Sequence, residues 1–107
     1  MPAKEEVIAL TAQLEALDSV GQERYRQEAK WGVQRHDMTV WLTVLSEEVG
    51  ELSQAILRYR EVMTDQRRDA IRAEAVQVAA VAVAMIEHLD EMSNAPFWRG
   101  GGEDDGR

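Results

Sequence analysis

The stretch that decides the fold of this chain is Ala75–Ile86, which reads AVQVAAVAVAMI. Gln77 is its only polar residue, so a helix here has apolar side chains on every side and needs more than one neighbour to cover them. The stretch is shorter than the ~20 apolar residues of a membrane span, which favours a buried helix, capped by Thr64 or Asp65 and reaching about Met92. Small residues permit close approach of its neighbours: Ala75, Ala79, Ala80, Ala82 and Ala84.

A second long helix is expected before this one, over residues 40–60. Asp37 or Thr39 is its expected cap, and polar loops are expected at residues 32–38 and 61–65. Its apolar residues recur three or four positions apart, which predicts one buried stripe. The stripe consists of Trp41, Val44, Leu45, Leu52, Ala55, Ile56 and Tyr59.

The N-terminal third of the chain is also expected to be helical. Residues 4–18 form an amphipathic helix, because apolar side chains recur at helical spacing at Val7, Leu10, Leu14 and Leu17. Gly21 is expected to break or bend the chain there. A further helical segment follows over Gln22–Trp31, with Gly32 as its stop.

These helices predict an all-α protein, a helical bundle completed by oligomerisation. At 107 residues the chain is expected to form a single helical domain, residues 1–93, followed by a flexible tail, residues 94–107, that has no periodicity. Three helices barely cover the apolar run at 75–86, so we expect a homodimer or homotetramer with this run near the subunit interface.

Composition excludes several classes of function. There is no cysteine, which rules out disulfides and thiolate chemistry and fits a cytoplasmic protein. The net charge of −8 argues against a nucleic-acid partner, because the phosphate backbone demands positive charge. The first residues lack the basic start and apolar stretch of an export signal, and no membrane association is expected.

The acidic motif E-E-V-G-E stands at residues 47–51. At about 100° per residue, Glu47, Glu48 and Glu51 fall within one ~100° arc of the helix, and Glu48 falls inside the apolar stripe. A carboxylate aimed at the core requires a positive partner, because burying an unpaired charge is costly. Oxygen ligands of this kind suit Mg²⁺ or Mn²⁺.

The next helix contributes Glu74 and Gln77. Since packed helices lie about 8–10 Å apart, these side chains can converge with Glu48 and Glu51 on one small cavity. Two alternatives stay open at this point. The glutamates can form a solvated helix face, the interpretation we favour for Glu47 taken alone. Gln77 can instead be a structural amide at a subunit interface.

Together these residues resemble the MazG-like group of all-α nucleoside triphosphate pyrophosphohydrolases, over about residues 20–92. The resemblance is carried by Lys30-Trp31-Gly32, Gln34, His36, Trp41, E-E-V-G-E-L at residues 47–52 and E-A-V-Q-V-A-A-V-A-V at residues 74–83. That group's signature is E-E-x-x-E followed by E-x-x-D on the next long helix. Gln77 stands where the signature has Asp, which removes one negative charge from the site.

The resemblance implies Mg²⁺-dependent cleavage between the α and β phosphates, which yields a nucleoside monophosphate and pyrophosphate. It implies that Glu47 orients or deprotonates the attacking water. The implied metal ligands are Glu48, Glu51, Glu74 and, as a weaker or outer fourth, Gln77. The implied substrate-binding residues are Lys30, Trp31, Gln34 and His36.

Four further side chains near the site carry expectations of their own. We expect Trp41 in the core and leave Trp31 open between core and base stacking. Arg35 is expected to be solvent-exposed, and His88 is expected at the surface near a helix end.

Two functions from different classes follow. The first is a hydrolase acting on phosphoric anhydrides, a nucleotide pyrophosphohydrolase that removes non-standard or surplus (d)NTPs. The alternative is a non-catalytic helical interaction module of the same fold, which the missing Asp at position 77 favours. Relatives often add a further helix that contacts the nucleotide, so in this chain those contacts are expected to be missing or to come from another subunit.

Overall fold

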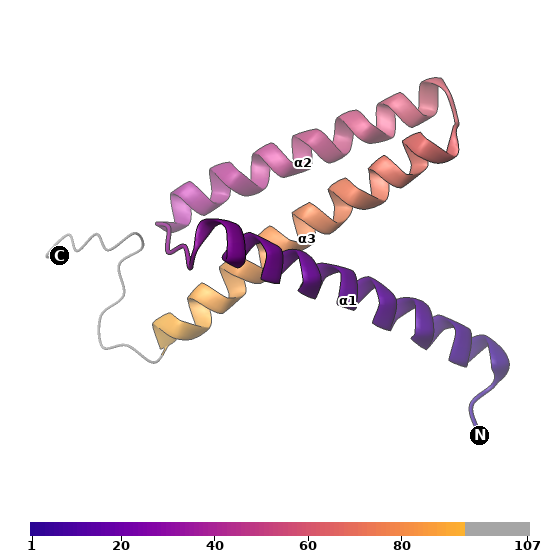
Figure 1. Ribbon diagram of the computed structural model, residues 1–107, viewed down its shortest axis with the longest axis horizontal. Coiled ribbons are helices and arrows are strands. Elements are labelled where there is room, and N and C mark those ends of the chain that lie inside the picture. The colour runs from indigo at the N-terminus through magenta and orange to yellow at the C-terminus, as the bar shows by residue number, and fades with distance from the viewer. Residues whose placement is uncertain (94–107) are drawn as a thin grey trace, which may run out of the picture.

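The computed structural model describes residues 1–93, which form three α-helices and, within that range, no strand. The helices are α1 (Lys4–Trp31), α2 (Met38–Glu61) and α3 (Asp65–Ser93). Figure 1 shows α2 and α3 lying side by side as an antiparallel hairpin, with α1 crossing α3 at an oblique angle. The all-α prediction is confirmed, and the tail predicted at 94–107 lies outside the described residues.

No helix in the described range combines the length and the apolar character that crossing a membrane requires. This holds for α3 despite its apolar middle, because both of its ends are charged.

The helix ends follow from local chemistry. The carboxylate of Asp37 accepts a hydrogen bond from the backbone N–H of Thr39 at 2.9 Å, so Asp37 caps α2. The hydroxyl of Thr64 accepts the backbone N–H of Arg67 at 3.1 Å in the same way at the start of α3. Gly32 ends α1 with a φ of 78°, a conformation that favours glycine.

We predicted that Gly21 breaks or bends the chain. The predicted break is wrong, because α1 runs unbroken from Lys4 to Trp31. A single glycine costs a helix only about 1 kcal/mol relative to alanine, and the residues that follow it, Gln22, Glu23 and Arg24, are good helix formers. The side-chain amide of Gln22 also donates a hydrogen bond to the carboxylate of Asp18 at 2.7 Å, which spans this position.

The core lies between α2 and α3. Trp41 on α2 packs against Val81 and Ala84 on α3, and Ala80 is fully buried. Small alanine side chains at these positions leave room for the indole of Trp41. The side chains of Met38, Val44, Leu45 and Met85 pack against this cluster and are half-buried. The prediction was wrong for Ile56, which is exposed on α2.

His88 is buried at 3 % exposure, so the prediction of a surface position was wrong. Its Nδ1 accepts a hydrogen bond from the indole N–H of Trp41 at 3.1 Å, which ties α3 to α2. Burial, and next the charge of Arg35, lower the pKa of His88 and keep the imidazole neutral, as this hydrogen bond requires. Sequence reasoning missed the contact because its two partners are far apart in the chain.

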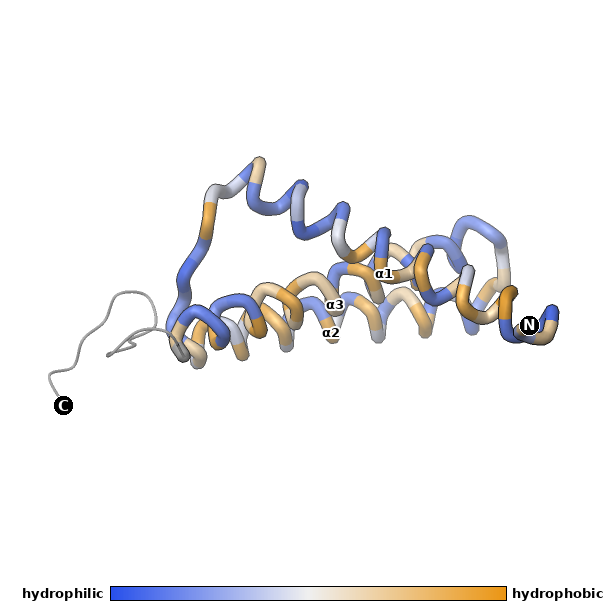
Figure 2. Tube along the Cα trace, turned by 90° about the horizontal axis from the view of Figure 1, so that it is seen from below, coloured by the Kyte–Doolittle hydropathy of each residue, from blue (hydrophilic) through white to orange (hydrophobic). Residues whose placement is uncertain are grey.

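The N-terminal half of α1 presents an uncovered apolar stripe. Val7, Leu10, Leu14 and Leu17 are between 47 and 65 % exposed. Figure 1 shows this half of α1 extending past α3, and Figure 2 shows hydrophobic positions along it. Within residues 1–93, therefore, the chain leaves apolar surface that its own helices do not cover.

We expect Gly21→Ala to raise the free energy of unfolding by about 1 kcal/mol, because alanine is the better helix former. An added Cβ at Gly21 has no atom within 4 Å, so no clash offsets the gain. Thermal unfolding at fixed protein concentration measures the change. Gly32→Ala is the matched control and should lower the melting temperature, since its φ of 78° disfavours a side chain. A lower melting temperature for Gly21→Ala would contradict a continuous α1.

Candidate metal centre

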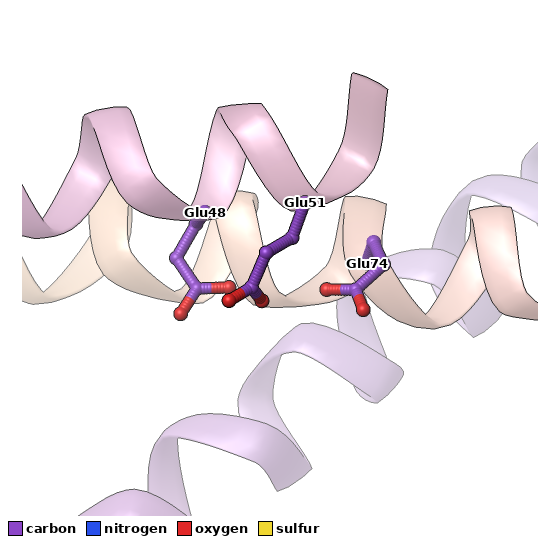
Figure 3. Close-up of side chains that lie close together, drawn as sticks. All are labelled: Glu48, Glu51 and Glu74. Atoms are coloured by element: carbon purple, nitrogen blue, oxygen red, sulfur yellow. The ribbon is translucent and has the colours of Figure 1, made fainter. Parts of the chain in front are cut away.

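Three carboxylates from two helices converge beside the core. Glu48 and Glu51 stand one helical turn apart on α2, and Glu74 faces them from α3. Figure 3 shows their carboxylate groups gathered on one side of the two helices. One oxygen from each residue lies within 4.8 Å of the others. The sequence-based expectation that these three side chains lie together matches their placement.

The spacing is close to what a divalent cation needs. Two oxygens on opposite sides of Mg²⁺, each about 2.1 Å from it, are about 4.2 Å apart. Oxygens at adjacent positions around the ion are closer, about 3.0 Å apart. Because the three carboxylate oxygens already lie within 4.8 Å of one another, small rotations of the flexible glutamate side chains are enough to bring them to one ion. The donor set is all oxygen and all anionic, which suits Mg²⁺ or Mn²⁺ rather than softer metals.

Glu48 lies in strongly negative surroundings. Burial and, after it, the negative charges of Glu51 and Glu74 raise the pKa of Glu48 above its usual range. Glu47 and Glu23 add to the same effect, so every charged neighbour that shifts this carboxyl is itself acidic. A bound cation would relieve all of these repulsions together.

Glu47 is exposed on α2, next to the three-carboxylate group rather than within it. That position agrees with the solvated-face interpretation of this residue taken alone. It also leaves the carboxylate free to reach water at the edge of the site.

A cavity of about 300 Å³ adjoins this group, between the second half of α1 and the α2–α3 pair. Glu48 belongs both to the carboxylate group and to the cavity wall. Among the predicted substrate-binding residues, Lys30, Trp31 and Gln34 line the cavity. His36 lies instead against Trp41, with ring centroids 4.8 Å apart. Arg35 was predicted to be solvent-exposed, but its side chain is half-buried and pairs with Glu91 on α3.

Gln77 lines the same cavity, and its amide is engaged by α1. Its Oε1 accepts a hydrogen bond from Gln27 Nε2 at 3.4 Å, and it also hydrogen-bonds the carboxylate of Glu23. The same Gln27 amide donates to Glu23 at 3.0 Å. Gln77 therefore joins α3 to α1 through a polar network at the position where the resembled signature places a carboxylate.

Arg24 fastens α1 to α3 beside this network. Its guanidinium donates two hydrogen bonds to Glu87 on α3, at 2.7 and 3.2 Å, and one to Glu28 at 2.8 Å. Hydrogen bonding to Glu87 raises the pKa of Arg24 above its already high value. With its side chain only 13 % exposed, Arg24 acts as a structural residue that holds the cavity wall in place.

Sequence reasoning assigned Lys30 and Trp31 of α1 to this site but missed Glu23 and Gln27, which line the cavity from the same helix. Glu23, Gln27 and Lys30 are spaced three and four residues apart, which places them on one helix face. That spacing was the available signal. Recognising it required knowing that α1 continues through Gly21 and crosses α3, which local periodicity does not show.

No protein family model matches this sequence, and neither a curated protein nor a solved structure is similar enough to count as a match. The geometry of the chain itself therefore carries the functional argument.

We expect Glu48→Gln to raise the melting temperature of the metal-free protein at pH 7 to 8. Each like-charge neighbour on a helix costs roughly 0.2–0.5 kcal/mol, so removing this charge should contribute on the order of 1 kcal/mol. Glu15→Gln on exposed α1 makes the same change in net charge and is the control. A lower melting temperature for Glu48→Gln would contradict the repulsion inferred at the site.

The difference in melting temperature between Glu48→Gln and the wild type should shrink as the pH falls. The raised pKa means that the folded protein takes up a proton on Glu48 at a higher pH than the unfolded chain does. The penalty from this residue is therefore complete above its folded-state pKa and disappears as the pH falls toward the ordinary glutamate value. Thermal unfolding of both proteins across pH 4 to 8 measures this convergence.

Proposed function

We propose that this chain is a Mg²⁺-dependent nucleoside triphosphate pyrophosphohydrolase of the MazG-like type, which cleaves (d)NTP to (d)NMP and pyrophosphate. The observation that carries the proposal is the three-carboxylate group of Glu48, Glu51 and Glu74, placed against a cavity of about 300 Å³. A cavity of that size matches the lower end of small-molecule sites. Housecleaning of non-standard nucleotides is the proposed role.

Glu48, Glu51 and Glu74 would hold the divalent cation. When bound, Mg²⁺ or Mn²⁺ supplies charge neutralisation to phosphate oxygens and makes a water molecule more acidic. Glu47 lies on the solvent side of the group, and we assign it to orienting the attacking water or accepting its proton. In this scheme Gln77 supports the site from its network with α1 and is not required as a metal ligand.

The aromatic residue Trp31 of the cavity suits the base of a nucleotide, and the basic residue Lys30 suits its negative charge. Trp31 is 61 % exposed, with the ammonium of Lys30 at 4.7 Å from its ring centroid. An exposed indole beside a cavity offers a face on which a base can stack. Gln34, on the loop that follows α1, adds amide hydrogen-bonding groups to the same wall.

The alternative is a non-catalytic helical module of the same fold. The observation that favours it is the engagement of Gln77 by Gln27 and Glu23, because the amide is then occupied by α1 and a cation would be left with the three carboxylates as protein ligands. The module predicts neither turnover nor stabilisation by a divalent ion.

A panel of canonical and modified (d)NTPs with Mg²⁺ or Mn²⁺ tests the enzyme. We expect pyrophosphate release from at least one nucleotide, its loss with EDTA, and a decrease of at least about 100-fold in Glu48→Gln. Glu15→Gln should retain full activity. If Glu48→Gln melts no lower than the wild type, as predicted above, loss of its activity does not reflect unfolding. If the wild-type protein releases no pyrophosphate across the panel, the non-catalytic module replaces the enzyme.

We also propose that the protein is a homodimer or homotetramer. Besides the uncovered stripe on α1, the other two helices also expose large apolar residues, and fully burying one such side chain contributes about 1.5–3 kcal/mol. These residues are Leu42 and Leu57 on α2 and Ile86 and Leu89 on α3.

Leu14→Glu should shift the protein toward the 12.1 kDa monomer and lower its melting temperature, because a charge enters the apolar interface. Sedimentation at several concentrations measures the mass. Ala12→Glu adds the same charge on the opposite side of the exposed helix and should leave the assembly intact. A wild-type protein that sediments as a monomer at all concentrations contradicts the proposed assembly.

A further inference from the structure

The cavity beside Glu48 contains three basic residues, Arg24, Arg26 and Lys30, and the structure uses each differently. Arg24 is committed to Glu87 and Glu28 and is nearly buried. Lys30 lies over the ring of Trp31. Arg26 differs from both, since its side chain is 66 % exposed and its ion pair is with Glu23, on the same helix.

Glu23 is an unusual counter-ion for an exposed arginine, because only 8 % of the residue is exposed. Burial opposes its ionisation, yet hydrogen bonds from Arg26, Gln77 and Gln27 outweigh that effect and hold the pKa of Glu23 below its usual range. Glu23 is therefore a charged and immobilised anchor at the base of the cavity wall.

Glu23 holds the guanidinium of Arg26 in place but occupies few of its hydrogen-bond donors. The guanidinium carries five N–H donors in a planar fork, and among the described residues it gives one hydrogen bond, from Nη2 to Glu23. The remaining donors belong to an exposed group on the cavity wall. A planar fork of this kind can bind a phosphate through two parallel hydrogen bonds.

The acidic surroundings of the cavity mean that a polyphosphate needs a cationic side chain of the protein to bind there. A polyphosphate entering this cavity meets the carboxylates of Glu48 and Glu23, and the chain carries a net charge of −8. A cation held by Glu48, Glu51 and Glu74 would neutralise one end of the ligand, and phosphate oxygens away from it would need positive charge from the protein. Arg26 is the arginine of this wall whose donors are not already taken by carboxylates of another helix.

We propose that Arg26 is a phosphate-binding residue of this cavity and that Glu23 is a positioning residue that orients its guanidinium. The ligand class is a polyphosphate chain, and the identification of that chain with a nucleotide rests on the proposed function. Neither residue belongs to the metal-binding carboxylates or to the E-E-x-x-E motif.

Binding of inorganic tripolyphosphate, measured by calorimetry with and without Mg²⁺, tests this assignment. Loss of a charge-assisted pair is expected to weaken binding about 10- to 100-fold in Arg26→Gln. Arg60→Gln, on the exposed end of α2, makes the same charge change and should bind as the wild type does. Arg26→Lys should restore part of the affinity, because it returns the charge without the fork. Helical circular dichroism establishes that each variant is folded.

The positioning role of Glu23 has its own readout. Glu23→Gln alone should weaken tripolyphosphate binding, and the double variant Glu23→Gln/Arg26→Gln should bind no more weakly than Arg26→Gln does. Additive losses in the double variant would overturn the positioning role, because they would mean that Glu23 acts independently of Arg26.

The outcomes separate this assignment from the proposed function. If Arg26→Gln binds tripolyphosphate as tightly as the wild type while the wild type still hydrolyses a nucleotide, the phosphate site is overturned and the enzyme stands. If the wild type neither binds Mg²⁺ nor hydrolyses nucleotides but binds tripolyphosphate through Arg26, the enzyme fails and the phosphate site stands. A wild type that does not bind tripolyphosphate overturns the phosphate site directly.

Discussion

Repulsion among Glu48, Glu51 and Glu74 is the interaction on which the functional account of this chain depends. The packing of α2 on α3 through Trp41 and Val81 places these carboxylates together, and burial raises the pKa of the innermost one. Hydrophobic packing thus holds an electrostatically unfavourable arrangement in place. Such an arrangement is typical of functional sites, where local stability is given up for the binding of a ligand.

Because α1 crosses α3 beside the carboxylate group, a cavity forms next to Glu48. Arg24 pairs with Glu87, and Gln27 bonds to Gln77, so the second half of α1 is fixed as one wall of the cavity. The first half of α1 has no such partners within the described chain and exposes its apolar stripe. In our proposal, one helix therefore serves a ligand site at one end and a second subunit at the other.

Local chemistry was enough to predict much of this fold. Caps at Asp37 and Thr64 and the stop at Gly32 follow from residue type. The approach of Glu74 to Glu48 follows from helical spacing once α2 and α3 are taken to pack side by side. The contacts of His88 and Arg26 were not predictable in this way. The buried state of His88 depends on Trp41 of another helix, and the place of Arg26 in the cavity depends on how α1 crosses α3. Tertiary geometry of this kind has no local signal.

The most direct test of the central claim is anomalous diffraction from crystals of the protein grown with Mn²⁺. The account predicts an anomalous peak among the carboxylates of Glu48, Glu51 and Glu74, with oxygen ligands slightly more than 2 Å from the ion. Crystals that show these three carboxylates together at saturating Mn²⁺, with no peak among them, would contradict it. The group would then be a surface feature of the helix pair rather than a metal centre.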